Sequence, residues 1–219
     1  MNIIKNILRL LILVISLIYC VSEAEAGDKN GTSSGSFLKI SLIPRAASLG
    51  NSFAALNLGS SSLVYNPAGI FTDKLMDISV AHTDWFAGID VNYLGVVHNS
   101  TFGSIGLSAI ALSTGDMEIT TPEQFQGTGE YFRASEFAFG AVYAKKISEK
   151  LIVGGSVKIL KSYLFNDGYS ASAFALDMGT LYKVSESLTF GVTLKDLGTD
   201  LKYISESFNL PTSISAGVT

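Results

Sequence analysis

Apolar residues alternate with small or polar residues along most of this chain, in stretches of roughly ten residues. The stretch from 151 to 163 shows the pattern clearly. One of its faces carries Leu151, Val153, Gly155, Val157, Ile159 and Tyr163, and the other carries Gly154, Ser156, Lys158 and Ser162. Because strand side chains point alternately to opposite faces, this two-residue period predicts strands with one apolar and one polar face.

The alternation predicts a series of strands whose boundaries are good to a few residues. They span Asp77–Trp85, Ile89–Asn99, Gly103–Ser113, Ala134–Ile147, Leu151–Leu164, Ser170–Val184, Leu188–Leu197 and Thr212 onward. The connections at 99–101, 148–150 and 185–187 are short and polar, whereas those at 114–133 and 198–211 are long. The short polar turns and the long loops fall on opposite ends of the strands, which is typical of an up-and-down barrel.

The first 26 residues have the features of a secretory signal peptide. Lys5 and Arg9 precede an apolar run, and an Ala-Glu-Ala cleavage site ends at Ala26. The single cysteine, Cys20, leaves a lipoprotein as the alternative, although the bulky Tyr19 before it disfavours lipid attachment. After the signal no apolar run of about 18 residues occurs, which excludes spanning helices.

The predicted fold is therefore all-β: an antiparallel transmembrane β-barrel with a short N-terminal plug. Residues 27–76 form a polar leader followed by the plug, and residues 77–219 form the barrel wall. The chain ends in an alternating segment without a closing partner, so we expect an incomplete barrel.

Within the plug, the sequence Asn66-Pro67-Ala68-Gly69 predicts a sharp turn. Proline forces the residue before it toward extended geometry, and we expect Gly69 to adopt a left-handed conformation. The turn is expected to seat the plug in the mouth of the barrel. We expect Gly69→Val to impair folding for the same reason.

Several motifs, in this order along the chain, resemble the PorV/PorQ family of outer-membrane proteins, relatives of the FadL-type fatty-acid transport barrels. The motifs are Phe37-Leu-Lys-Ile40, Arg45-Ala-Ala-Ser-Leu-Gly50, Phe53-Ala-Ala-Leu56, Asn66-Pro-Ala-Gly69, Thr83-Asp-Trp85, Tyr143-Ala-Lys-Lys146, Gly154-Gly-Ser-Val-Lys158, Ala173-Phe-Ala-Leu-Asp-Met-Gly179 and Asp196-Leu-Gly198. The chain departs from the family before the NPAG motif, where members usually carry an acidic pair and this sequence has residues 57–62 without one. Members are also longer, with a barrel of fourteen strands in the FadL type, so the resemblance implies that about 8 of 14 strands are present here.

The resemblance implies a non-enzymatic role at the outer membrane. PorV/PorQ proteins dock or shuttle components of type IX protein secretion and surface attachment, so the implied partners are outer-membrane lipid and secretion-translocon or cargo proteins. FadL-type proteins are channels for hydrophobic small molecules such as long-chain fatty acids, which is the alternative. The long 114–133 connection is the expected contact surface for a partner, because loops on a rigid scaffold carry function.

One pair of charges can be placed from the sequence. If Asp167-Gly168 forms a two-residue type I′ turn, the register sets Lys158 opposite Asp177. Both residues belong to the face opposite the apolar one, so we expect an ion pair in the lumen. Two separately solvated charges are the alternative.

Candidate chemistry is otherwise sparse. The only histidines are His82 and His98, and neither has a spaced set of cysteines or carboxylates, so the sequence predicts no metal site, no catalytic site and no cofactor. Aromatic residues near the expected strand ends are interpreted as an interfacial girdle: Trp85, Phe86, Tyr93, Tyr143, Tyr163, Tyr169 and Tyr182. A net charge of −4 without basic clusters argues against nucleic acid as a partner.

Overall fold

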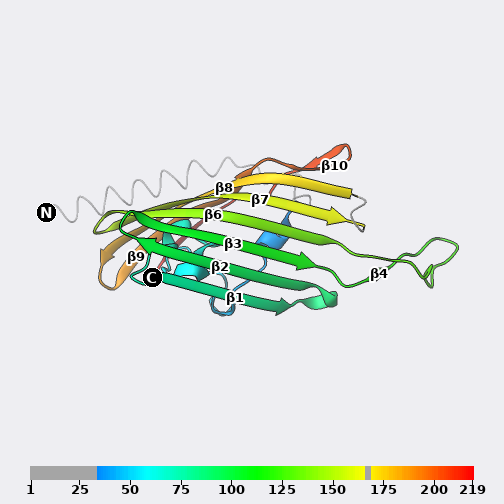
Figure 1. Cartoon of the computed structure of the whole chain (residues 1–219), viewed down its shortest axis with the longest axis horizontal. Coiled ribbons are helices and arrows are strands. Elements are labelled where there is room, and N and C mark those ends of the chain that lie inside the picture. The colour runs from blue at the N-terminus through cyan, green and yellow to red at the C-terminus, as the bar shows by residue number, and fades with distance from the viewer. Residues whose placement is uncertain (1–33, 166–168) are drawn as a thin grey trace. The chain divides into compact units, whose positions relative to one another are not determined.

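The computed structural model describes residues 34–165 and 169–219. Its main element is one antiparallel sheet in the order β1-β2-β3-β6-β7-β8-β9-β12 (Figure 1). The strands are β1 (Met76–Asp84), β2 (Asp90–Ser100), β3 (Gly103–Ser113), β6 (Ser135–Ser148), β7 (Leu151–Leu164), β8 (Tyr169–Ser185), β9 (Leu188–Gly198) and β12 (Ser213–Val218). Sequential strands are neighbours throughout, so the predicted all-β, up-and-down arrangement of these strands is confirmed.

The predicted strand boundaries agree with the structure to within one residue. The agreement has a simple cause. Strands such as β1, β2 and β8 alternate between more and less exposed positions over most of their length, and polar or glycine residues interrupt the alternation at their ends. Two-residue periodicity is therefore the dominant local signal in this chain.

Both long connections contain small hairpins that the sequence did not indicate. The first holds β4 (Met117–Glu118) and β5 (Tyr131–Phe132), and the second holds β10 (Leu201–Tyr203) and β11 (Glu206–Phe208). Figure 1 shows β4 on an arm that extends beyond the end of the sheet, at the end where the β10 hairpin also lies. The short turns after β2, β6 and β8 occupy the opposite end, as expected.

The segment from 34 to 75 contains no strand. Its helical elements are short: η1 (Ser36–Lys39), α2 (Pro44–Ser48), η2 (Gly59–Ser62) and η3 (Pro67–Ile70), while a further turn, η4 (Phe86–Gly88), joins β1 to β2. We call residues 34–75 the inner segment. The signal peptide expected at 1–26 and the start of the leader lie outside the described residues.

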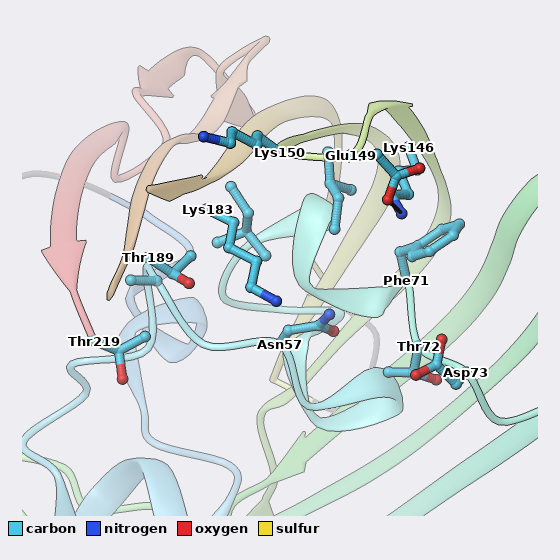
Figure 2. A pocket seen from close by; sticks show the side chains of 13 residues that line it. Asn57, Phe71, Thr72, Asp73, Lys146, Glu149, Lys150, Lys183, Thr189 and Thr219 are labelled. Atoms are coloured by element: carbon cyan, nitrogen blue, oxygen red, sulfur yellow. Dashed lines mark hydrogen bonds and ion pairs between the residues drawn. The ribbon is translucent and has the colours of Figure 1, made fainter. Parts of the chain in front are cut away.

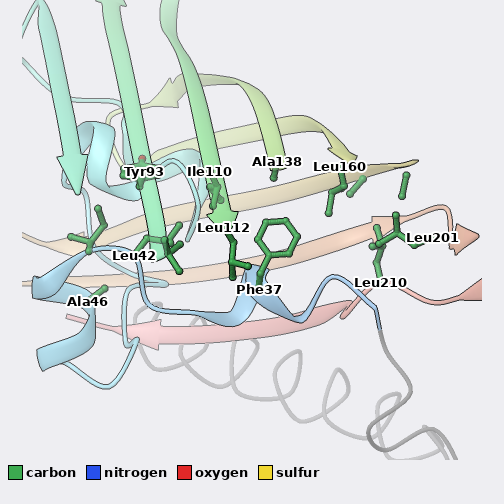
Figure 3. Packing of buried hydrophobic residues seen from close by; sticks show 14 of the residues in the cluster. Phe37, Leu42, Ala46, Tyr93, Ile110, Leu112, Ala138, Leu160, Leu201 and Leu210 are labelled. Atoms are coloured by element: carbon green, nitrogen blue, oxygen red, sulfur yellow. The ribbon is translucent and has the colours of Figure 1, made fainter. Parts of the chain in front are cut away.

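The inner segment packs against one face of the sheet, which we call the inner face. Phe37, Leu42 and Ala46 of the segment form a buried cluster with strand residues such as Ile110 and Leu160 (Figure 3). Small residues, Ala138, Ala171, Ala173 and Ala175, make up much of the strand contribution. Short side chains on the inner face let the segment approach the backbone of the sheet closely.

Across the described residues, no helix combines the length and apolar character needed to cross a bilayer.

Candidate functional site

Large apolar side chains cover the opposite, outer face of the sheet in rows that run across the strands. One row of paired residues consists of Val80, Leu94, Ala109, Phe139, Ile159 and Phe174. The next consists of Ile78, Val96, Leu107, Ala141, Val157 and Leu176. We call these two rows the apolar band. It contains no charged residue, and its large members except the partly buried Val96 are exposed: Phe174 is 62% accessible and Val80 is 75% accessible.

Polar side chains appear on the outer face only outside this band. Toward the long loops, the adjacent row consists of His82, Asn92, Ala111, Phe137, Lys161 and Ser172. In the row beyond it, Asp84 lies opposite Asp90. The outer face therefore changes from apolar to polar along the strands, toward the end that carries the long loops.

The Asn66-Pro67-Ala68-Gly69 turn lies fully buried against the inner face. The Asn66 side-chain oxygen accepts a hydrogen bond from the backbone N–H of Ala68 (3.0 Å), which caps the short helix η3. The Asn66 amide group donates to the backbone oxygens of Ala54 (2.5 Å) and Thr180 (3.2 Å). One side chain thus joins two parts of the inner segment to strand β8.

Glycines on the inner face make room for this turn. Gly154 and Gly179 are paired across β7 and β8. A Cβ atom on Gly154 would lie 2.5 Å from the carbonyl carbon of Pro67, and one on Gly179 would lie 1.9 Å from the side-chain oxygen of Asn66. Any larger residue at these positions would displace the turn from the sheet.

The expected left-handed conformation of Gly69 is wrong. Gly69 belongs to η3 and is not among the residues with positive φ. Its small size matters for packing instead, because a Cβ atom there would lie 2.6 Å from the backbone oxygen of Leu56 and 2.8 Å from Cβ of Ser62. The expected damage from Gly69→Val keeps its direction, but steric overlap is its cause.

The structure brings Lys158 and Asp177 together on the inner face. The Lys158 ammonium lies 2.9 Å from an Asp177 carboxylate oxygen and also contacts the carboxylate of Asp196. Ser156 donates to Asp177 (2.7 Å), as does the backbone N–H of Asp196 (2.8 Å). All three charged side chains are almost completely buried. We call them the ion cluster.

The strand register that led us to this pair is wrong by two residues. Lys158 pairs with Ala175, and Asp177 pairs with Ser156, because Leu164 and Tyr169 form the last pair before the loop. The Asp167-Gly168 turn lies outside the described residues. A slip of two residues preserves the face on which a side chain lies, so the two charges still meet, diagonally rather than directly across.

Asp196 is a member of the ion cluster that the sequence pattern did not predict. Lys195 and Asp196 of β9 together face one residue of β8, Asp177, which is the geometry of a β-bulge. Asp196 has a positive φ of 59°, and its side chain points to the inner face. A signal was present: the outer apolar residues Val192 and Leu194 are two apart, but the next, Leu197, follows after three.

The bulge also balances the buried charge. Lys195 lies on the inner face, with its ammonium 5.7 Å from the centre of the Tyr65 ring. The inner face at this level therefore carries Lys158 and Lys195 against Asp177 and Asp196. Burying charges in pairs avoids the high cost of isolated ions in a low-dielectric interior.

The aromatic residues do not all follow the expected girdle. Tyr93 is buried on the inner face, where its hydroxyl donates to the backbone oxygen of Ser60 (2.6 Å), so its expected interfacial position is wrong. The other residues of the set are exposed or partly exposed: Trp85, Phe86, Tyr143, Tyr163, Tyr169 and Tyr182.

A pocket of about 370 Å³ lies at the short-turn end, between the inner segment and the ends of β6 to β9 (Figure 2). Figure 2 shows the Lys183 ammonium directed into it toward Asn57. Its charges are largely paired. The ammonium nitrogen of Lys146 lies 2.6 Å from a carboxylate oxygen of Glu149, and that of Lys183 lies 2.9 Å from a carboxylate oxygen of Glu186. This pairing does not favour an anion site.

The two histidines lie at opposite ends of the β1–β2 hairpin. His98 and Ser100 are exposed on one face of β2, whereas Asn99 between them is buried on the other and donates to the backbone oxygen of Lys74 (2.6 Å). A histidine, a hydroxyl and an orienting amide are therefore not brought into mutual reach there. His82 contacts Asn92 and Asp84, with nitrogen–oxygen distances of 2.8 and 3.0 Å.

A scan against protein-family models finds no match for this chain, and a search of curated proteins finds none.

Proposed function

We propose that this chain forms part of the wall of an outer-membrane β-barrel of the PorV/PorQ type. The observation that supports the proposal is the apolar band, a contiguous set of large exposed hydrophobic side chains without a charge. Soluble monomers seldom expose apolar patches larger than a few hundred Å². Outer-membrane lipid is the partner that would cover the whole face, since barrel strands present an apolar band to acyl chains.

Within that barrel, we propose a non-enzymatic docking or shuttle role in protein secretion or surface attachment. The inner segment and the ion cluster occupy the space beside the inner face, which favours docking over passage through the wall. The arm formed by residues 114–134 is the proposed contact surface. It carries Asp116, Glu118, Glu123 and Glu130, and Phe125 on the arm is 75% accessible.

The alternative is a FadL-like channel for hydrophobic small molecules such as long-chain fatty acids. One observation favours it: a hollow of about 640 Å³ runs along β12 and includes Leu49, Leu56 and Ile214 in its lining. A partly apolar hollow beside a strand would suit a molecule that leaves through the wall.

The experiment has two stages. First, cells expressing the full chain are fractionated; recovery in the outer membrane, with migration on gels that changes on heating, supports the barrel, and recovery as a soluble periplasmic protein contradicts it. Second, in-cell crosslinking from position 125 is compared with crosslinking from position 204, an exposed residue of the other long connection. A protein adduct at 125 only, lost when 117–132 is replaced by a short turn, supports docking.

The channel alternative predicts a different result in the second stage. Extraction of the purified protein would then release stoichiometric fatty acid. Substitution of Leu49 or Leu56 by tryptophan would abolish retention of the fatty acid. A protein without bound lipid and without a site-specific adduct contradicts both roles while leaving the barrel itself intact.

A further inference from the structure

The outer end of the β1–β2 hairpin gathers three residues that can ligate metals. Asp84 and Asp90 are paired directly across the two strands, and His82 is paired with Asn92 one row away. One ligand atom from each of His82, Asp84 and Asp90 lies within 4.8 Å of the other two. The sequence spacing alone did not reveal this set, because only the strand register brings Asp90 beside His82.

We propose that His82, Asp84 and Asp90 bind a divalent transition-metal ion such as Zn²⁺. An imidazole nitrogen and two carboxylate oxygens form a donor set suited to Zn²⁺, which bonds these atoms at about 2.0–2.2 Å. Two tetrahedral ligands at such distances lie about 3.3 Å apart. The 3.0 Å between Nε2 of His82 and Oδ1 of Asp84 is close to that separation, and the exposed side chains can rotate to complete it.

Asn92 holds the other ring nitrogen of His82. Its side-chain oxygen lies 2.8 Å from Nδ1 of His82 and accepts the Nδ1 proton. Nε2 of His82 lies 3.0 Å from a carboxylate oxygen of Asp84, so a proton on Nε2 bridges these two atoms, and a cation bound by both would take the place of that proton. Metal-ligating histidines have this arrangement, with the second nitrogen held by an acceptor. Asn92 is therefore a positioning residue for the site.

Asp84 and Asp90 give a separate reason to expect a cation at this end of the hairpin. Like charges directly opposite each other in an antiparallel pair destabilise the pairing. Asp84 and Asp90 nevertheless terminate β1 and begin β2 as the last pair of the hairpin. A divalent cation between them converts that repulsion into attraction. The inference does not rest on the proposed membrane role, because the ligands lie at the strand ends in either setting.

The test measures Zn²⁺ binding by calorimetry on the full chain, purified without a histidine tag and stripped of metal. We expect one saturable site per chain, weakened at least tenfold by His82→Ala and by Asp84→Asn. His98→Ala is the matched control, because His98 is the exposed histidine at the other end of the same hairpin and, among the described residues, joins no such cluster. It should bind Zn²⁺ as the unmodified chain does.

Two further variants separate positioning from folding. Asn92→Ala should weaken Zn²⁺ binding about 10–100-fold, while Asn92→Asp, which keeps an acceptor oxygen, should retain it. Co²⁺ substituted for Zn²⁺ should give a visible ligand-field band that His82→Ala removes. Equal Zn²⁺ binding by the His82 and His98 variants, or no saturable binding by the unmodified chain, would overturn the proposal.

Discussion

The outer face of the sheet exposes large apolar side chains, whereas the inner face buries the ion cluster beside its hydrophobic core. Val157 and Lys158 are neighbours in β7, yet the valine is 57% accessible and the lysine only 8%. On β8, Phe174 is 62% accessible, whereas Asp177 is 3% accessible. In soluble proteins, lysine and aspartate are almost never fully buried unless paired. The difference teaches that the accessibility of a side chain has to be interpreted from what covers its face. The inner segment covers the inner face and, in our proposal, lipid covers the outer face.

The largest effect should come from removing the cation of the ion cluster. Lys158→Met leaves Asp177 and Asp196 buried without their partner, and breaking a buried ion pair in this way costs about 3–5 kcal/mol. Urea unfolding in detergent micelles or lipid vesicles measures the loss. Lys161→Met is the matched control, since Lys161 is exposed on the outer face of the same strand.

A rescue experiment sharpens this prediction. Adding Asp177→Asn and Asp196→Asn to Lys158→Met removes the unpaired charges and should restore most of the lost stability. If the triple variant is no more stable than Lys158→Met, burial of unpaired charge is not the cause.

A charge on the outer face should have the next largest effect, and only in a bilayer. Val157→Arg in the apolar band is expected to cost about 2–4 kcal/mol of folding free energy in lipid vesicles. Ser172→Arg, two rows nearer the long loops, should cost about 0–1 kcal/mol. An equal, small effect of both substitutions would show that the outer face does not contact hydrocarbon.

Contact between the inner segment and the sheet should be sensitive to a single methyl group. Gly179→Ala places a Cβ atom against Asn66, and overpacking of this kind costs about 1–3 kcal/mol. Gly155→Ala is the control, because the nearest atom to its added Cβ is the backbone oxygen of Asp177 at 3.7 Å. Limited proteolysis of residues 34–75 should be faster in the Gly179 variant alone.

The smallest effect concerns the arm, which lies beyond both faces. The hydrogen bond and charge of Arg133 hold the pKa of Asp116 below its ordinary value of 3.8. This contact thus stabilises the arm above pH 3.8, and the contribution is lost as the pH falls through the lowered pKa. Arg133→Gln should return the pKa of Asp116 toward 3.8, as an NMR titration would show, with no change in the stability of the sheet.

Much of the fold could be predicted from the sequence because strand periodicity is a local property. The alternation around Val157 or Phe174 fixes which side chains share a face, and polar turns fix where the strands end. The prediction that Lys158 pairs with Asp177 held despite an error of two residues in the register, because strand side chains return to the same face every two residues.

The features that were missed depend on contacts between distant segments. Asp196 reaches the ion cluster through a bulge that follows from pairing with β8. Gly69 is required by the close approach of Leu56, not by its own backbone angles. Tyr93 points inward because Ser60 of the inner segment accepts its hydroxyl proton. The three-residue step from Leu194 to Leu197 is a trace of the bulge within one strand, but the contacts that Asp196, Gly69 and Tyr93 make cannot be read from spacing alone.

The central claim, that the outer face contacts acyl chains, is tested most directly by a spin-label scan of residues 171–179 in lipid vesicles, in a Cys20→Ser background. The account predicts a two-residue period in which labels at 174, 176 and 178 collide freely with dissolved oxygen but little with a water-soluble nickel chelate, while those at 173 and 175 collide with neither. Frequent collisions of the labels at 174, 176 and 178 with the nickel chelate would contradict it.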